Sequence, residues 1–208
     1  MARVDVWPVV HDERKALAAD LEGLGDADWA TVSLCTGWTV RDVVAHMTAT
    51  SKITGATFFP KLITSGFSLK RLQAKDIAKE KGGSPADTLA GFRAQVDSTG
   101  RPPGPIDTML GEVIVHSEDV RRALGIAHEY PREAAAQVAD FYRGSNLVIG
   151  GRRRAAGLRF QATDLDWSAG DGPVVSGPIV SLMLAIAGRT RAVDDLTGDG
   201  VATLRSRG

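Results

Sequence analysis

The stretch Gly111–Gly125, GEVIVHSEDVRRALG, decides how the rest of the chain is interpreted. It predicts a helix, because Val113, Val120 and Leu124 recur at three- to four-residue spacing and form an apolar stripe. Gly125 is a suitable C-terminal stop, and two arginines in the last turn complement the helix dipole. One side of this helix is therefore expected to be buried, which leaves another side for polar chemistry.

The polar side of the same helix carries a chemical pattern. Glu112 and His116 are four residues apart and project from neighbouring turns, and Asp119 follows three residues later. A carboxylate and an imidazole placed in this way can bind one metal ion together, with Asp119 orienting the histidine, if a further ligand comes from elsewhere. A helical Glu-x-x-x-His is also common by chance. The alternative is a solvated Glu112 and an Asp119 that pairs with Arg122.

Composition places the chain among globular proteins. It has 208 residues, 43% hydrophobic and 24% charged, as expected for one large domain or two small ones. The formal net charge of +0 argues against a nucleic-acid-binding protein, and no apolar run approaches the roughly 20 residues of a membrane span. The N-terminus lacks the apolar core of a signal peptide. A single cysteine, Cys35, excludes an intrachain disulfide, fits a cytoplasmic location and suggests a small buried apolar residue more than a nucleophile.

Two helices are expected in the first fifty residues. Val10 and Leu17 lie on one stripe, which Arg14 interrupts, and a loop is expected over residues 26–37. Thr39 is a good N-cap for the second helix, with an acid three residues later as in a capping box. His46 lies two turns into this helix, beside its apolar face, and is either a metal ligand or an ordinary core histidine.

In the rest of the chain, the spacing of the apolar residues changes near Gly150. Residues 53–72 predict two broken helical pieces that line a pocket, and the basic section 70–81 is expected to face solvent. Further helices are expected from Ser84 and from Pro131 to about residue 148. Beyond Gly150 the period of the apolar residues changes from 3.6 to 2. The elements expected there are strands near 158–163 and 174–175, a helix over 179–187 and a strand near 201–204. We therefore predict a helical bundle over 1–150 and a small α+β domain over 151–208.

Three stretches resemble a known family. Leu34–His46, LCTGWTVRDVVAH, resembles the first motif of the mycothiol-dependent maleylpyruvate isomerase family, and Glu112–Gly125 is similar to its second motif. Residues 170–189 resemble the end of that family's small C-terminal α+β domain. The resemblance implies a DinB-like four-helix bundle followed by a small α+β domain. It also implies that His46, Glu112 and His116 bind a divalent metal, for which zinc is the first candidate.

The resemblance further implies a reaction. Mycothiol, a low-molecular-weight thiol, would be the cofactor of an isomerase or thiol transferase that acts on a small electrophilic, possibly acidic, substrate. Arg189 matches the glycine-arginine pair of the family's C-terminal domain and is the catalytic candidate; the alternative is a surface arginine at a helix C-terminus. We expect no nucleic-acid or membrane partner. The alternative function is a non-catalytic metal- or ligand-binding regulator on the same bundle, since a fold alone does not fix function.

Overall fold

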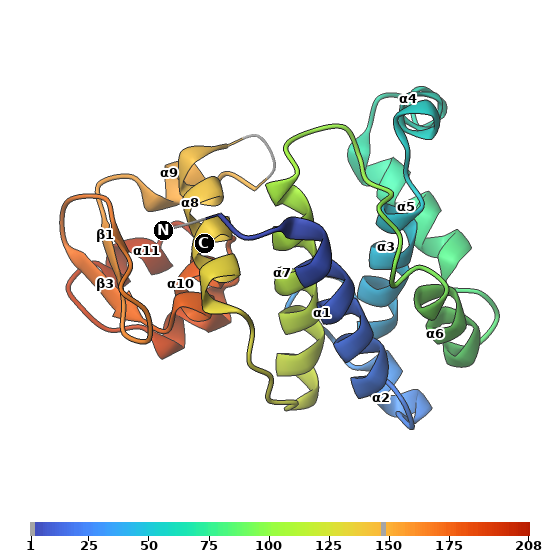
Figure 1. Cartoon of the computed structure of the whole chain (residues 1–208), viewed down its shortest axis with the longest axis horizontal. Helices are drawn as coiled ribbons and strands as arrows, with labels where there is room; N and C mark the ends of the chain where they lie inside the picture. Colours follow the sequence, from blue (N-terminus) through green and yellow to red (C-terminus); the bar gives the residue numbers. More distant parts are fainter. Residues whose placement is uncertain (1–2, 147–148) are drawn as a thin grey trace. The chain divides into compact units, whose positions relative to one another are not determined.

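The structure is a computed structural model that describes residues 3–146 and 149–208 (Figure 1). They form two compact units, one comprising Val6–His128 and the other Glu129–Gly208 with the residues that precede Val6. The boundary falls before helix α8 (Arg132–Gly144), because α8 packs against α10 (Ile179–Ile186) within the second unit. The sequence places the boundary later, near Gly150, since helical periodicity alone does not show which core a helix joins.

The first unit is helical and contains the residues of the two N-terminal motifs. Its helices are α1 (Val6–Asp20), α2 (Asp26–Ala30), α3 (Val40–Ser51), α4 (Gly55–Thr64), α5 (Leu69–Glu80), α6 (Pro85–Arg93) and α7 (Asp107–Leu124). Helix α3 packs against α5, α6 and α7, and α7 also packs against α1 (Figure 1). The predicted stop of α7 is present, because Gly125 adopts the left-handed conformation with φ 70°. The predicted loop over 26–37 contains the short helix α2.

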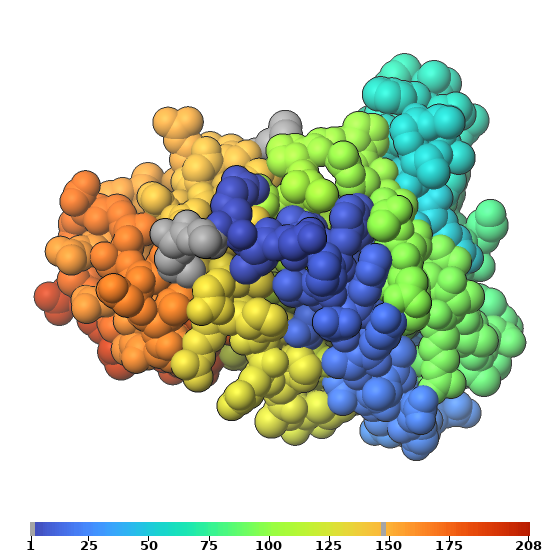
Figure 2. Space-filling view, in the orientation of Figure 1, coloured from blue at the N-terminus to red at the C-terminus, as the bar shows by residue number. Residues whose placement is uncertain are grey.

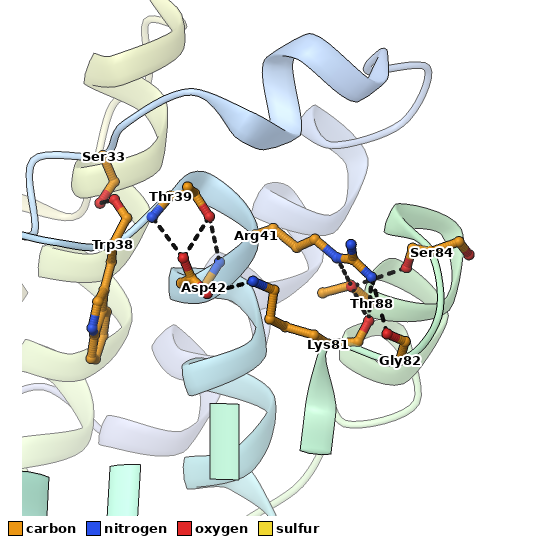
Figure 3. A network of polar contacts seen from close by, with 9 residues as sticks. All are labelled: Ser33, Trp38, Thr39, Arg41, Asp42, Lys81, Gly82, Ser84 and Thr88. Atoms are coloured by element: carbon orange, nitrogen blue, oxygen red, sulfur yellow. Dashed lines mark hydrogen bonds and ion pairs between the residues drawn. The ribbon is translucent and has the colours of Figure 1, made fainter. Parts of the chain in front are cut away.

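The start of α3 is fixed by a network of polar contacts (Figure 3). The Asp42 carboxylate accepts the Thr39 backbone N–H at 2.9 Å, and the Thr39 hydroxyl accepts the Asp42 backbone N–H at 3.2 Å, as the sequence predicts. Lys81 Nζ donates to Asp42 at 2.8 Å. Arg41 donates to the Lys81 carbonyl at 2.9 Å and to the Thr88 hydroxyl at 3.0 Å. Helix α3 is therefore joined at its first turn to the end of α5 and to α6.

Ion pairs join α1 to α7 and to the residues that follow it. The guanidinium of Arg121, fully buried, donates from Nε to Asp20 at 2.7 Å and from Nη1 to Glu13 at 3.5 Å. His128 Nε2 lies 2.8 Å from the same Glu13 carboxylate. Burial raises the pKa of Glu13, and the neighbouring His128 and Arg121 act in the opposite direction. These contacts fix how α1 lies against α7, and α1 carries a second buried arginine, Arg14.

Two helices occupy the segment 52–81, but the second, α5, lies further along the chain than the sequence predicts and covers most of the section expected only to face solvent. Helix α4 buries none of its residues, and Phe59 and Ile63 remain more than half exposed. In the space-filling view α4 projects from the rest of its unit (Figure 2). Helix α5 buries Leu72 and Ile77 and packs against α3. The predicted role of this segment in lining a pocket stays a prediction.

The second unit combines helices with a small sheet. Its elements after α8 are α9 (Gly151–Ala155), β1 (Arg159–Ala162), β2 (Ser168–Ala169), β3 (Val174–Gly177), α10, the 3-10 helix η1 (Thr190–Asp195) and α11 (Val201–Arg205). The sheet order is β2-β1-β3, with β1 antiparallel to β2 and parallel to β3. The predicted fold class, mainly helical with a small α+β part, is confirmed. Among residues 3–146 and 149–208, no helix combines the length and apolar character needed to cross a membrane.

One expectation for this unit differs from the structure. The strand expected near 201–204 is the helix α11, because the edge of β3 is already covered by the chain before it: Thr197 and Ser176 exchange backbone hydrogen bonds, and Gly200 N donates to Val174 O at 2.8 Å. Apolar spacing over four residues fits either element, and Leu204 is buried from a helix. Helix α8 ends at Gly144, and the expected end near residue 148 lies outside the described residues.

Candidate functional site

Helices α3 and α7 bring the two predicted histidine ligands together. The rings of His46 and His116 lie with their centroids 5.0 Å apart in an edge-to-face arrangement. Both side chains are partly exposed, although most of their neighbours on the two helices are buried. Two imidazoles at this separation, on facing helices of a bundle, can bind the same ion.

Glu112 lies one turn before His116 on α7, and its carboxylate is buried without a hydrogen-bond partner on either oxygen. Burial raises the pKa of Glu112, while the neighbouring His116 and Arg14 oppose the rise. The Thr50 hydroxyl lies near enough to favour the charged form but lacks the geometry of a hydrogen bond. A buried carboxylate without a partner is costly. A bound cation would supply the missing interaction.

Arg14 is the second charged group near Glu112. It is fully buried, and its Nη1 donates to the Ser98 carbonyl at 2.7 Å, whereas Nε and Nη2 have no hydrogen-bond partner. Burial lowers the pKa of Arg14, and the charge of Glu112 opposes this shift. Arg14 is the residue that interrupts the apolar stripe of α1. An arginine at a position of the stripe that is otherwise apolar indicates a buried charge, but the sequence does not show which acidic residue lies near it.

Asp119 orients His116. Its buried carboxylate oxygen Oδ2 lies 3.0 Å from Nδ1 of His116. With the carboxylate ionised, Nδ1 carries the proton and donates, so Nε2 keeps the lone pair that a metal ion needs. The contact agrees with the orienting role expected for Asp119. Arg122, its alternative partner in the sequence, pairs with Glu118 at 2.6 Å.

The loop before α3 covers the two histidines. The Trp38 ring centroid lies 4.9 Å from that of His46 and 6.0 Å from that of His116. The Ser33 hydroxyl donates to the Trp38 carbonyl at 2.9 Å, and the Leu34 N–H donates to the Asp119 carbonyl at 3.2 Å. The loop is therefore attached to α7 at the residue that orients His116. Trp38 lines the site, as its closeness to His46 in the sequence suggests.

A second group of ligand-type residues lies in the same place. Cys35, His116 and Asp119 each offer one ligand atom, and these atoms all lie within 4.8 Å of one another. The group shares His116 with the predicted ligands and includes neither His46 nor Glu112. From the sequence alone, Cys35 is expected to be a small buried apolar residue. Its position three residues before Trp38, in the same motif, is the signal that links it to the site.

Arg189 lies in the other unit, immediately before η1. Its Nη1 donates to the Ala187 carbonyl at 3.4 Å. Arg154 lies close by and donates to the carbonyls of Ile186 and Ile149. Burial is the main cause that lowers the pKa of Arg154, and the charge of Arg189 adds to the effect. The catalytic role of Arg189 stays a prediction.

The predicted ligands fit a divalent metal in their chemistry. Two imidazole nitrogens and one carboxylate oxygen are a ligand set of catalytic zinc sites, which keep a coordination position open. The unpartnered Glu112 carboxylate and the histidine fixed by Asp119 are both features that such a site requires. The alternative of a solvated Glu112 does not hold, because its carboxylate is buried.

Comparisons with known proteins bear on the family and the fold of the chain. The sequence profile of the family described as "Mycothiol maleylpyruvate isomerase N-terminal domain" matches residues 10–103, which include His46 and end before Glu112. Comparison with curated protein sequences found no significant match. Two solved structures are similar to this chain, the mycothiol-dependent maleylpyruvate isomerase and a histidine-to-alanine mutant of it.

Both structures superpose with a TM-score of 0.67 at 16% sequence identity, over 96% of this chain and 96% of the other. Identity at this level shows a shared fold. It extends the likeness beyond the profile match, to α7 and to the second unit. The family resemblance inferred from the three motifs is confirmed: residues 10–103 match the profile of the mycothiol maleylpyruvate isomerase N-terminal domain, and the chain has the fold of the mycothiol-dependent maleylpyruvate isomerase.

Proposed function

We propose that this protein is a metal-dependent isomerase that uses mycothiol as its thiol cofactor and acts on a small unsaturated acid. One observation carries the proposal: the buried Glu112 carboxylate has no hydrogen-bond partner, and it lies one turn from a histidine that is paired with a second histidine across the bundle. A cation bound beside the two histidines would interact favourably with this carboxylate. The name of the similar structure, the mycothiol-dependent maleylpyruvate isomerase, supports the choice of thiol and reaction.

The chain's own residues have separate roles in this proposal. His46, Glu112 and His116 would hold the ion, and Asp119, through its contact with Nδ1, would leave the Nε2 lone pair of His116 available to it. A zinc-type ion, when bound, lowers the pKa of a thiol that it holds, so that the thiolate is available at neutral pH. Trp38 and its loop exclude water from one side of the two histidines.

The proposed isomerisation needs only reversible thiol addition. The thiolate adds to one carbon of the substrate's cis double bond, and the electron pair moves to the conjugated carbonyl. Rotation about the resulting single bond, followed by loss of the same thiolate, gives the trans isomer and regenerates the cofactor. Arg189 is proposed to bind a substrate carboxylate, because a bidentate guanidinium suits a planar anion.

Selection of the thiol must come from the protein. An ion binds every thiolate through the same sulfur, so it cannot distinguish mycothiol from glutathione. A site that hydrogen-bonds the sugar and inositol hydroxyls of mycothiol would reject a thiol that lacks them. We therefore expect mycothiol to be required and glutathione to substitute poorly.

The test measures isomerisation of maleylpyruvate with each thiol, in the wild type, His116→Ala and Arg189→Met. We expect turnover with mycothiol in the wild type, none in His116→Ala, and a raised KM for the acid in Arg189→Met. Arg153→Met, which removes an exposed arginine of the same unit, is the control for Arg189. Equal turnover with both thiols, or full activity in His116→Ala, would contradict the proposal. Metal analysis of the purified protein tests the ion independently.

A further inference from the structure

Exposed apolar side chains are concentrated in one short segment of the first unit. Of the five large apolar side chains that are exposed in the described part of the chain, four lie between residues 59 and 69. Phe59 and Ile63 are one turn apart on α4, Phe67 lies in the turn after α4, and Leu69 begins α5. We call these four residues the apolar patch. A concentration of exposed apolar side chains marks an interaction surface more often than a chance feature.

The backbone of Phe67 is a second sign of a binding surface. Phe67 has a φ of 56°, and it is the one residue other than glycine with a positive φ in the described part of the chain. This left-handed conformation is strained for a bulky side chain. The side chain is 76% exposed, so packing within the protein offsets little of the strain. The turn therefore presents the ring to a partner at a cost to the free protein.

The segment that carries the apolar patch is strongly basic. Residues 52–81 contain seven basic and two acidic residues, although the whole chain has a formal net charge of +0. Both acidic residues pair with lysines of the same segment, Asp76 with Lys61 at 2.9 Å and Glu80 with Lys52 at 2.6 Å. The positive charge of the remaining basic residues is thus not balanced within the segment.

Two of these basic side chains border the turn that holds Phe67. Lys75 Nζ donates to the Thr64 carbonyl at 2.9 Å, at the end of α4. The guanidinium of Arg71 lies beside Gly66, the residue before Phe67. Both side chains are exposed. An exposed aromatic ring bordered by cations matches the composition of surfaces that bind anionic lipid interfaces.

We propose that the apolar patch and the basic residues around it bind the anionic headgroup layer of a lipid bilayer. The apolar side chains enter the boundary between headgroups and acyl chains, and the cations lie against the lipid phosphates. The shape of the unit favours this partner, because α4 projects from its surface and an interface accepts a projection without a matching groove (Figure 2). A second copy of the chain fits less well, since it would bring two positively charged segments together.

This proposal concerns a surface and is independent of the metal and of the thiol. An interfacial helix lies in the plane of the membrane and needs no spanning stretch. The expectation of no membrane partner, drawn from the sequence, considered spanning segments alone. Failure of the proposal would therefore leave the proposed function unchanged.

Flotation of the full chain with lipid vesicles tests the proposal. The wild type is expected to float with vesicles of phosphatidylcholine and phosphatidylglycerol, to stay behind with phosphatidylcholine alone, and to bind less at high salt. Phe67→Gly is expected to weaken binding about tenfold, because a buried ring is lost. Glycine accepts the φ of this position, so the variant should be at least as stable as the wild type. Val32→Ser, which removes the fifth exposed apolar side chain, is the control.

A second pair of variants tests the charges. Lys70→Gln with Arg71→Gln is expected to weaken binding to anionic vesicles at least about tenfold. Arg152→Gln with Arg153→Gln removes two adjacent exposed arginines from the other unit and should leave binding unchanged. Circular dichroism checks that each variant is folded.

Three results would overturn the proposal. They are absence of flotation with anionic vesicles, equal flotation with neutral ones, and unaltered binding in Phe67→Gly. Sedimentation velocity provides a fourth. A wild-type dimer that Phe67→Gly converts to a monomer, without flotation of either protein, would assign the apolar patch to a second copy of the chain.

Discussion

Nδ1 of His116 lies 3.0 Å from the buried Oδ2 of Asp119, one turn further along α7. The pair resembles the carboxylate–histidine arrangement that fixes the tautomer of metal-binding histidines. Because the Asp119 backbone also receives the N–H of Leu34, one residue connects the orientation of His116 to the loop that carries Cys35 and Trp38. Substitutions of Asp119 should therefore weaken metal binding more than they lower the stability of the fold.

Asp119→Asn is expected to weaken zinc binding by about 10- to 100-fold, because an amide holds the histidine less firmly and no longer makes it more basic. Competition with a chromophoric chelator measures the affinity. Glu118→Gln is the matched control, since this neighbouring carboxylate pairs with Arg122 and makes no contact with the His116 ring that the structure describes. Equal affinities in the two variants would exclude the orienting role of Asp119.

Glu112→Gln is expected to have opposite effects on stability and binding. The amide removes a charge whose burial without a partner is unfavourable, so the metal-free protein should become more stable or stay unchanged in urea unfolding. Zinc binding should fall at least about 100-fold, because an amide oxygen is a poor zinc ligand. A metal-free variant that is much less stable than the wild type would show that Glu112 serves chiefly as the partner of Arg14.

Trp38→Phe is expected to remove a spectroscopic signal without removing the ion. The Trp38 ring lies close to both histidines, whereas Trp7, Trp29 and Trp167 lie elsewhere in the chain. Addition of zinc to the wild type should change the tryptophan fluorescence, and the variant should lack most of this change. The zinc affinity of the variant, measured by chelator competition, should stay within about threefold, because an aromatic ring still covers the site. An unaltered fluorescence response would place the ion away from Trp38.

Asp42→Asn tests the network at the start of α3 through its pH dependence. Burial favours the neutral acid, but Lys81 and the Thr39 cap outweigh it and hold the pKa of Asp42 below its ordinary value. The ionised carboxylate therefore stabilises the fold above an unfolded pKa of about 4, and this stabilisation is lost as pH falls through the lower folded pKa.

The variant should thus cost about 1 kcal/mol of unfolding free energy near pH 7 and less near pH 3. Urea unfolding at a series of pH values measures this difference. Lys81→Met, which removes the ion pair and keeps the cap, should cost less at neutral pH, since its ammonium is partly exposed. A cost of Asp42→Asn that is the same at both pH values would contradict the assignment.

Local patterns were sufficient for most of the helices. The capping residues Thr39 and Ser84 and the stop at Gly125 act within a few residues of their own position, so the sequence predicts them correctly. The last element shows the limit of such patterns. Val201–Arg205 is too short for its apolar spacing to distinguish helix from strand, and the chain before it already covers the edge of β3.

The sequence by itself determined the spacing of Glu112, His116 and Asp119 on one helix, and it marked His46 as their counterpart through its motif. It could not determine that Cys35 lies beside His116, because that contact joins residues about eighty positions apart through a loop. Nor could it assign Arg14 to a buried place near Glu112. Tertiary structure decided both. The loop before α3 is attached to α7 and brings Cys35 beside His116, and the packing of α1 against α7 buries Arg14 near Glu112.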